Sequence, residues 1–198
     1  DVAVEDSSFT TGRRGVAATV IVEKIVGSLA EFGGSLEECK KLGDKVNKNS
    51  GSMGVAFSSC TVPAAGKPTF ELAADEMEFG VGIHGEPGRR RDKIKSAQEI
   101  TNELLEAIIE DLKPENNDEI LLFVNGMGGT PLTELYLVYN NSKKMLDNKK
   151  IKISRSLVGN YCTSLEMQGA SITLTKLDQE LAKHWDSAVH TAAMRWGM

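Results

Sequence analysis

The residues whose types and spacing best suit chemistry lie around His84. The run 76–88 alternates β-forming residues with Gly80 and Gly82, which is the period-two pattern of a strand, and it ends in glycines and a proline. Glycines inside a strand usually mark a bulge or a place where something approaches the backbone closely. Because His84 follows at the end of this strand, beside Gly85, we expect its side chain to be presented to a small ligand.

His84 has structural interpretations as well. A lone histidine is more often a hydrogen-bonded structural or surface residue than a catalytic one, although its charge changes near neutral pH and suits many roles. A metal site built from His84, Glu86 and Cys162 is a further alternative. The single His-x-Glu pair offers too few ligands to favour that alternative, so no metal site is predicted.

The composition is that of an ordinary globular protein. The 198 residues are 40% apolar and 26% charged, with a formal net charge of −5. The negative charge argues against a nucleic-acid partner, and the short basic run 89–91 is expected to be a solvated loop.

The sequence lacks the marks of export or membrane insertion. No apolar stretch reaches the roughly 18 residues of a membrane span, and the first residues do not resemble a signal peptide. Cys39, Cys60 and Cys162 are an odd number without close spacing, so neither a disulfide framework nor a zinc motif is expected. These observations favour a cytoplasmic protein with no membrane partner.

Hydrophobic periodicity predicts helices that alternate with strands. Helical spacing of apolar residues predicts helices over 16–32, 36–47, 93–112, 132–146 and 177–185. Alternating or continuous apolar runs predict strands over 53–62, 69–72, 76–84, 119–124, 150–158 and 170–176. Ser35 and Glu38 form a capping box before the second helix, and Thr130 and Pro131 are expected to be the N-cap and first residue of the fourth.

Two further segments carry weaker signals. The glycine-rich turn 125–131 could bind an anion on free backbone N–H groups, but its spacing matches neither the P-loop nor the dinucleotide fingerprint. A tight strand-to-helix connection is the favoured interpretation. The tail 186–198 carries an aromatic residue, Trp196, near its end and is expected to dock onto the body, while His184 and His190 are expected to serve surface or tail-docking roles.

Strands interleaved with helices indicate an α/β domain with a mixed sheet. A boundary is predicted near residues 49–52, since two helices precede it and nearly all predicted strands follow it. Residues 1–50 are then the helical end of a second, incomplete α/β domain, and residues 51–198 form the mixed-sheet α/β domain that carries His84.

Several motifs, in order along the chain, carry a resemblance to a known family. They are the segments 12–15, 60–68, 76–88, 128–136 and 161–165, and the similarity continues to the end of the sequence. Together they resemble the substrate-binding K subunit, or K domain, of dihydroxyacetone (glycerone) kinase. Members of that family carry upstream a second histidine in a Gly-rich loop and an aspartate that acts as general base. This sequence contains neither, so it is similar to the C-terminal half to two-thirds of the subunit.

The resemblance implies a covalent role for His84. In the family, the histidine at this motif position adds through a ring nitrogen to the ketone carbon of dihydroxyacetone and forms a hemiaminal. Glycerol has no carbonyl to attack, so covalent capture discriminates where the hydrogen bonds of so small a ligand would struggle. Gly82 and Gly85 would let the ketone approach the ring, and Glu86 is a candidate to orient the imidazole by fixing its tautomer.

The resemblance also implies a phosphotransferase, a glycerone kinase, that works as part of a larger assembly. In the family the nucleotide, ATP or ADP with Mg²⁺, sits on a separate L subunit or domain, so this chain is expected to bind no cofactor. Because the catalytic base of the family would lie upstream, this fragment alone is expected to phosphorylate nothing. The phosphate donor, ATP itself or a phosphotransfer relay, stays open, and a homodimer is expected. The alternative is a dihydroxyacetone-sensing coactivator of a transcription factor, which binds the ketone without kinase turnover.

Overall fold

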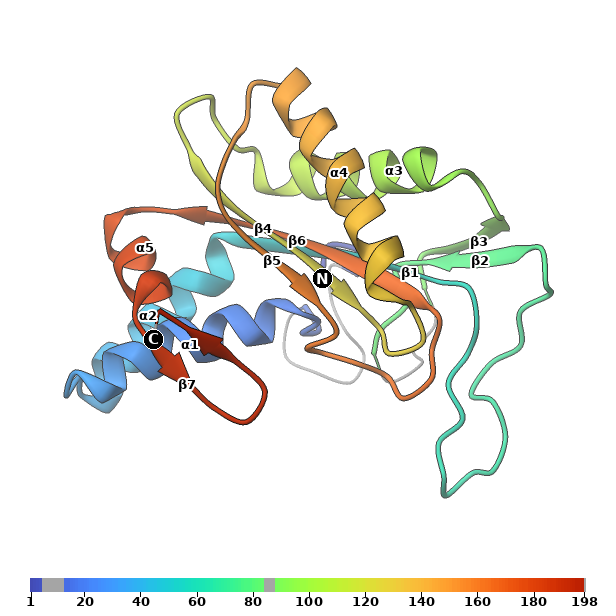
Figure 1. Cartoon of the computed structure of the whole chain (residues 1–198), viewed down its shortest axis with the longest axis horizontal. Helices are drawn as coiled ribbons and strands as arrows, with labels where there is room; N and C mark the ends of the chain where they lie inside the picture. The colour runs from blue at the N-terminus through green and yellow to red at the C-terminus, as the bar shows by residue number, and fades with distance from the viewer. Residues whose placement is uncertain (5–12, 84–87, 198) are drawn as a thin grey trace.

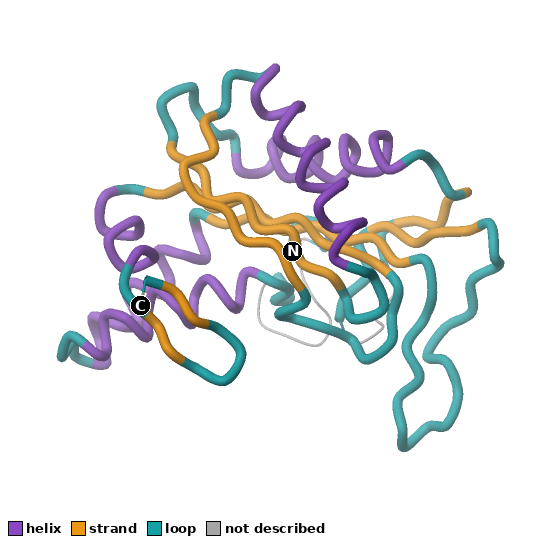
Figure 2. Tube along the Cα trace, in the orientation of Figure 1, coloured by secondary structure: helices purple, strands orange, loops and turns teal. Residues whose placement is uncertain are grey.

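The computed structural model describes residues 1–4, 13–83 and 88–197, and within them helices cover both faces of a mixed sheet (Figure 1, Figure 2). The strand order is β3-β2-β1-β6-β4-β5, in which β4 and β5 run parallel and the other neighbours run antiparallel. The predicted mixed-sheet α/β class is confirmed. The strands are β1 Ser50–Ala56, β2 Glu76–Phe79, β3 Arg90–Lys93, β4 Glu119–Gly126, β5 Lys152–Gly159 and β6 Gly169–Leu177. The helices are α1 Ala18–Glu31, α2 Leu36–Lys48, α3 Ala97–Leu112, α4 Leu132–Asn148 and α5 Gln179–Asp186.

Strand β4 shows why the molecule has two hydrophobic cores. Ile120 and Leu122 belong to the cluster formed with α3 and α4, whereas Leu121 and Phe123 belong to the cluster formed with α1, α2 and α5. Successive side chains of a strand point to opposite faces, so a continuous apolar run is suited to a strand that is covered on both sides. The apolar run 119–124 is therefore such a strand, as its sequence predicts.

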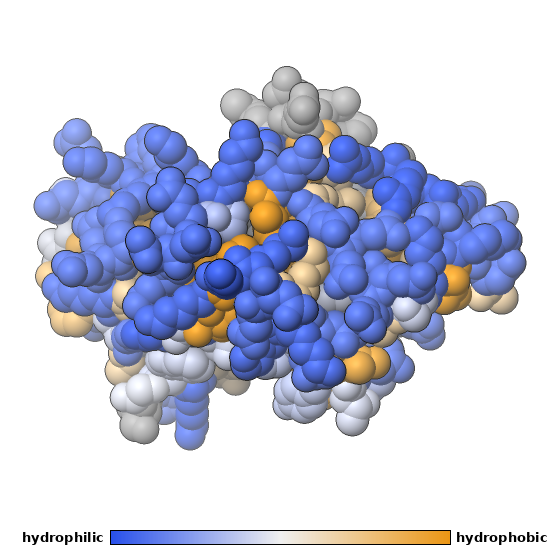
Figure 3. Space-filling view, turned by 90° about the horizontal axis from the view of Figure 1, so that it is seen from above, coloured by the Kyte–Doolittle hydropathy of each residue, from blue (hydrophilic) through white to orange (hydrophobic). Residues whose placement is uncertain are grey.

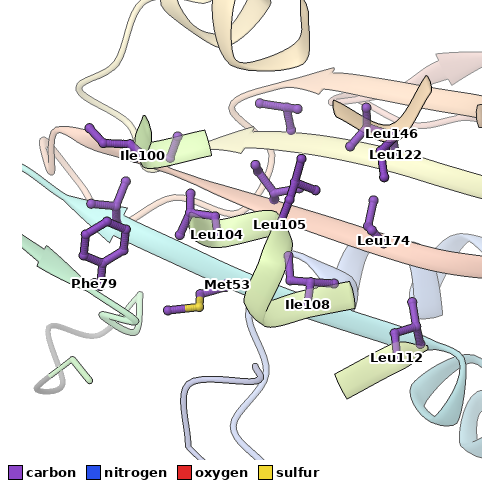
Figure 4. Packing of buried hydrophobic residues seen from close by; sticks show 14 of the residues in the cluster. Met53, Phe79, Ile100, Leu104, Leu105, Ile108, Leu112, Leu122, Leu146 and Leu174 are labelled. Atoms are coloured by element: carbon purple, nitrogen blue, oxygen red, sulfur yellow. The ribbon is translucent and has the colours of Figure 1, made fainter. Parts of the chain in front are cut away.

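Helix α3 packs an apolar stripe onto one face of the sheet. Ile100, Leu104 and Ile108 recur at helical spacing and are buried in a cluster with Phe79 of β2 and Leu174 of β6 (Figure 4). Burying a side chain of this size contributes about 1.5–3 kcal/mol relative to leaving it in water. This packing anchors β2, the strand that leads toward His84.

The short strand β3 is not expected from the sequence. The pattern predicts a solvated loop over 89–91 and a helix over 93–112, but Arg90–Lys93 pairs with β2 and α3 begins only after Ser96. Ser96 and Glu99 form a capping box, in which each side chain accepts a hydrogen bond from the other residue's backbone N–H. A charged edge strand carries no hydrophobic alternation, which is why periodicity misses it.

The segment between β1 and β2 contains less strand than predicted. The strand expected over 53–62 ends at Ala56, and the one expected over 69–72 is absent from the described structure. Two backbone N–H groups of residues 69 and 70 donate to the Ser59 hydroxyl at 3.0 and 3.1 Å, and this local bonding replaces a sheet ladder. The first prediction is confirmed for 53–56 and wrong for 57–62, and the second is wrong, because apolar and β-branched residues also occur in loops that are held by side chains.

The first two helices cover the other face of the sheet. Ile21 of α1 and Val46 of α2 are fully buried in a cluster that includes Trp185 of α5. Helix α2 opens at the predicted capping box, in which the Ser35 side chain accepts from a backbone N–H in the first turn. The predicted boundary near residues 49–52 coincides with the junction of α2 and β1, and the division into two domains stays a prediction.

The C-terminal tail folds back onto α1. Val189–His190 and Arg195–Trp196 pair as a small hairpin, β7–β8, and the Trp196 ring lies 5.9 Å from the Trp185 ring. Lys24 of α1 is 8% exposed, and its ammonium group donates to two backbone carbonyls at the start of the tail while lying near both indole rings. The buried Lys24 thus holds the tail against α1. This agrees with the expectation from the sequence that the tail docks onto the body.

Candidate functional site

His84 belongs to the connection between β2 and β3, residues 80–89, which we call the His84 connection. His84, Gly85 and Glu86 lie outside the described residues, whereas Gly82 and both ends of the connection are described. The described part of the site is therefore its base. This base consists of two backbone segments that leave adjacent antiparallel strands and of the side chains that hold them.

The incoming end of the His84 connection leaves the sheet at Gly80. This residue has a φ of +73°, a left-handed conformation that glycine adopts without strain. Its N–H donates a 2.6 Å hydrogen bond to the carbonyl of Gly54 in β1, and its own carbonyl accepts from the guanidinium of Arg14. The strand predicted over 76–84 therefore ends at Phe79, because the chain turns at the next residue.

The outgoing end is fixed to β2 by two backbone donors. The Gly88 N–H donates a 2.8 Å bond to Glu78 Oε1, and the Arg89 N–H donates a 2.6 Å bond to the Phe79 carbonyl. A Cβ at Gly88 would collide with the Phe79 carbonyl oxygen and lie 2.8 Å from the Glu78 Cγ. Glycine is therefore required where the outgoing backbone crosses β2.

Glu78 is a buried carboxylate at this base. The residue is 9% exposed, and its second oxygen, Oε2, accepts from the Arg91 guanidinium at 3.2 Å. A carboxylate is kept out of water only where it is paired and hydrogen-bonded, and both conditions hold here. Sequence reasoning did not single out Glu78, because a charged residue between Met77 and Phe79 is the ordinary alternation of a strand with one buried face.

Arg14 is a buried cation at the incoming end. It is 7% exposed, and its Nε donates a 2.7 Å bond to Asp1 Oδ2 in addition to the bond from Nη2 to the Gly80 carbonyl. Arg14 lies in the 12–15 motif that contributes to the family resemblance. No contact could be assigned to it from sequence, because its partners are distant along the chain.

The incoming end reaches the core cluster of α1, α2 and α5. Val81 and Gly82 are buried, and Ile83 packs against that cluster, as does the half-buried Cys162. Burial, together with the nearby Glu23 carboxylate, raises the pKa of the Cys162 thiol. The thiol is therefore protonated at neutral pH and is a poor metal ligand or nucleophile there.

The loop that carries Cys162 is held by Asn125, a residue that the sequence did not single out. Asn125 is fully buried at the end of β4, and its Oδ1 accepts from the N–H groups of Tyr161 and Cys162 at 3.0 and 2.9 Å. Its Nδ2 donates to the Cys162 carbonyl at 2.8 Å. One side chain thus joins the end of β4 to the loop that follows β5.

The glycine-rich turn after β4 is a structural connection. The N–H groups of Met127 and Gly129 donate to backbone carbonyls beside and within the start of β6, and Thr130 Oγ1 bonds both the carbonyl and the N–H of Gly169. These amides are occupied by the protein, so they do not form an anion cradle. The expected N-cap was wrong by one residue: Pro131 is the N-cap of α4, because Thr130 is used for the bonds to β6.

Of the two described histidines, His184 is packed between helices and His190 is on the surface. His184 is buried, and its Nδ1 lies 2.9 Å from the Ser28 hydroxyl while its ring lies 6.2 Å from that of Phe32. His190 is exposed and pairs with Arg195 in the β7–β8 hairpin. His184 therefore joins α5 to α1.

Cavities adjoin both faces of the sheet. One of about 670 Å³ is lined by residues that include Arg13, Arg14 and Asp111, and one of about 300 Å³ lies between α3 and α4 with a mostly apolar lining. Seen from the side of α3 and α4, the surface is mostly hydrophilic and shows apolar residues in a narrow seam (Figure 3). Among the described residues, no three His, Cys, Asp or Glu side chains gather as a metal site would require. No helix in the described ranges has the length and apolarity to cross a bilayer.

Comparison with known proteins identifies the family. The model of the Dak1 domain matches residues 1–193. The chain is 45% identical, over 221 aligned residues, to the PEP-dependent dihydroxyacetone kinase, dihydroxyacetone-binding subunit DhaK of Escherichia coli (strain K12), covering 100% of this chain and 62% of that protein. It is 52% identical, over 180 residues, to the PTS-dependent dihydroxyacetone kinase 1, dihydroxyacetone-binding subunit DhaK of Listeria innocua, covering 91% of this chain and 55% of that protein.

The fold agrees with these sequence matches. A solved structure described as the dihydroxyacetone kinase operon co-activator Dha-DhaQ is similar with a TM-score of 0.85 and 33% identity, over 95% of this chain and 58% of that one. The chain thus spans between 55% and 62% of the lengths of these three relatives. The resemblance inferred from the motifs is confirmed. By sequence and by fold, this chain belongs to the Dak1 domain family.

Proposed function

We propose that this chain is the dihydroxyacetone-binding part of a dihydroxyacetone kinase, and that His84 captures the ketone covalently. The observation that carries the proposal is the match of the whole chain to subunits named for binding dihydroxyacetone, at 45% and 52% identity. The clamped base of the His84 connection supports it. A nucleophile gains most when it is held at a reproducible distance and angle from its electrophile.

The proposed capture step balances without a co-reactant. The unprotonated nitrogen of the neutral His84 ring donates its lone pair to the ketone carbon, and the π electrons of the C=O bond move to the oxygen. That oxygen gains a proton and the other ring nitrogen loses one, so the hemiaminal is neutral and no group leaves. Glycerol lacks the carbonyl and cannot form this bond.

The neighbours of His84 have proposed supporting roles. Glu86 would accept the N–H of the other ring nitrogen and so keep the attacking nitrogen unprotonated. Gly82 and Gly85 would leave room for the ketone beside the ring, because neither carries a side chain. Glu86 is proposed because it stands two residues after His84, and the two glycines because they flank His84 in the motif at 76–88.

The kinase activity is proposed for a larger assembly. A partner L subunit or domain would carry, with Mg²⁺, either ATP or an ADP that a phosphotransfer relay converts to ATP. The γ-phosphoryl group of that ATP would be transferred to a hydroxyl of the bound ketone by in-line displacement, leaving ADP. This chain would contribute substrate binding and no nucleotide site of its own. The binding subunit is proposed to act as a homodimer.

A second candidate function has a specific observation in its favour. The solved structure with a TM-score of 0.85 is named as an operon co-activator rather than a kinase. A co-activator of this type would bind the ketone by the same chemistry and pass no phosphate on. The two functions differ in whether the intact protein supports turnover with a nucleotide-bearing partner subunit.

The mass of the intact protein tests the capture step. After incubation with dihydroxyacetone, without borohydride, we expect a mass gain equal to one ketone molecule, mapped to the peptide that contains His84. The variant His84→Ala should show no gain, while the variant of the exposed histidine, His190→Ala, should behave as the wild type. No adduct on the wild type, or an adduct that survives in His84→Ala, defeats the proposal.

A coupled assay then separates kinase from co-activator. The intact protein is mixed with a nucleotide-bearing L subunit, its phosphate donor and dihydroxyacetone, and the phosphorylated product is measured. Product formation that requires His84 supports the kinase. Adduct formation without any product supports the co-activator.

A further inference from the structure

We propose that Glu78 is a positioning residue, which sets the place of the outgoing end of the His84 connection and thereby the reactivity of His84. This inference rests on the proposed function, because the position of that end matters only if His84 binds the ketone. The supporting observations concern described residues of β2, β3 and the base of the connection.

The geometry gives Glu78 a direct hold on the connection. Its Oε1 accepts the Gly88 N–H at 2.8 Å, four residues after His84, while its Oε2 is held by Arg91 at 3.2 Å. A hydrogen bond to an ionised acceptor is roughly twice as strong as one between neutral groups. The carboxylate therefore links the connection to β3 through one rigid, charged bridge.

The burial of Glu78 indicates a purpose beyond solubility. Its side chain is 12% exposed, and its chain neighbours Met77 and Phe79 are fully buried. Removing a carboxylate from water costs folding free energy, and an apolar residue at such a position would avoid that cost. The Glu78 carboxylate accepts hydrogen bonds from one backbone amide of the His84 connection, that of Gly88, and from one arginine, Arg91.

The opposite end of the connection is held in a comparable way. The carbonyl of Gly80 accepts from Arg14, which is itself paired with Asp1. At each end of the connection a backbone group is thus hydrogen-bonded to a buried charged side chain: the Gly80 carbonyl accepts from Arg14, and the Gly88 N–H donates to Glu78. With the incoming end fixed by Arg14, the freedom left to the outgoing end depends on Glu78 and on the Arg89 N–H bond to Phe79.

Glu76 provides a matched control on the same strand. It lies two residues before Glu78, on the same face of β2, and its carboxylate lies 3.9 Å from Arg91 and 3.8 Å from Lys93. Its side chain is 26% exposed, and its carboxylate accepts a hydrogen bond from the N–H of Ala73, outside the connection. The variant Glu76→Ala therefore removes one carboxylate near Arg91 and Lys93, and it removes no hydrogen bond to the His84 connection.

The experiment measures the rate of dihydroxyacetone adduct formation on the intact protein by mass spectrometry, together with the melting temperature. We expect Glu78→Ala to slow adduct formation at least tenfold, since small misplacements of a reacting group cost up to about 100-fold. Glu78→Gln keeps an oxygen acceptor for the Gly88 N–H and should stay within about threefold of the wild type by the same reasoning. Glu76→Ala should react at the wild-type rate.

The outcomes separate this inference from the proposed function. If the wild type forms no adduct, the proposed function fails. If the wild type forms the adduct and Glu78→Ala forms it equally fast, the positioning role is wrong while the function stands. If Glu78→Gln is as slow as Glu78→Ala, or if Glu76→Ala is equally slow, loss of local charge explains the effect and the positioning role is again wrong. Recovery in Glu78→Gln, with melting temperatures of the two alanine variants alike, supports it.

Discussion

The backbone N–H of Arg89 donates a 2.6 Å hydrogen bond to the carbonyl oxygen of Phe79, and this bond closes the base of the connection that carries His84. It is the last rung between β2 and the chain that returns as β3. The connection is therefore anchored by backbone at its outgoing end as well as by the Glu78 carboxylate. The glycine that precedes Arg89 is what allows the approach.

Gly88→Ala should destabilise the protein and impair ketone capture. The added Cβ would overlap the Phe79 carbonyl oxygen, which is backbone and cannot rotate away. Overpacking of this kind costs about 1–3 kcal/mol. Urea denaturation measures the stability, and the adduct assay measures the capture.

The control for this variant is Gly27→Ala in α1. A Cβ at Gly27 meets no described atom within 4 Å, so the substitution should be neutral or stabilise by about 0.5–1 kcal/mol. A Gly88→Ala protein as stable as the wild type would show that the outgoing end does not cross β2 as closely as the structure has it.

Asn125→Ala should destabilise the loop that carries Cys162. The substitution leaves the N–H groups of Tyr161 and Cys162 without their acceptor, at about 1–3 kcal/mol for each group that stays buried and unpaired. Hydrogen exchange should speed up at those two amides before the rest of the sheet opens. Gln98→Ala, on the exposed side of α3, should change stability by less than about 0.5 kcal/mol. Unchanged exchange at both amides would refute this role of Asn125.

Periodicity predicted well those elements whose structure depends on a few consecutive residues. The apolar run of β4 requires cover on both faces, and the Ser35 capping box lies entirely within four residues. Strand β3 was missed because its residues are charged, and the strand predicted up to 84 stops at Phe79 because Gly80 turns left-handed. These failures arise from pairing and backbone conformation, which side-chain patterns do not record.

The site was predictable only in part for a similar reason. His84, Gly82, Gly85 and Glu86 stand together in one motif, so sequence can propose them. Glu78 accepts from a backbone amide ten residues later, and although both residues lie in the run 76–88, a side-chain pattern does not record a bond to a backbone N–H. Arg14 reaches Gly80 across 66 residues, and only the folded structure shows that contact.

Lys24→Ala should loosen the C-terminal hairpin. The ammonium group donates to the carbonyls of Trp185 and Ser187, and hydrogen bonds to charged groups contribute about 1.5–3 kcal/mol. Limited proteolysis should cut the β7–β8 segment faster in this variant than in the wild type. The free energy of global unfolding should fall by less than the free energy that holds the hairpin in place. Lys41→Ala, an exposed lysine of α2, is the control. Equal cleavage rates in the two variants would contradict the fastening role of Lys24.

Cys162 should react slowly with iodoacetamide at neutral pH. Burial raises the pKa of its thiol, so the reactive thiolate is scarce until the pH exceeds the ordinary pKa of a cysteine thiol. The rate, followed by peptide mapping, should keep rising with pH after glutathione has reached its plateau. A Cys162 rate profile that follows glutathione would show that burial does not control this thiol.

The covalent state of the bound ketone tests the central claim most directly. Dihydroxyacetone labelled with ¹³C at the ketone carbon can be followed by NMR while bound to the intact protein. A hemiaminal on His84 predicts that the ketone signal is replaced by that of a saturated carbon bearing oxygen and nitrogen, and that His84→Ala abolishes the change. A bound ligand whose labelled carbon remains a ketone, or a saturated signal that persists in His84→Ala, would contradict the account.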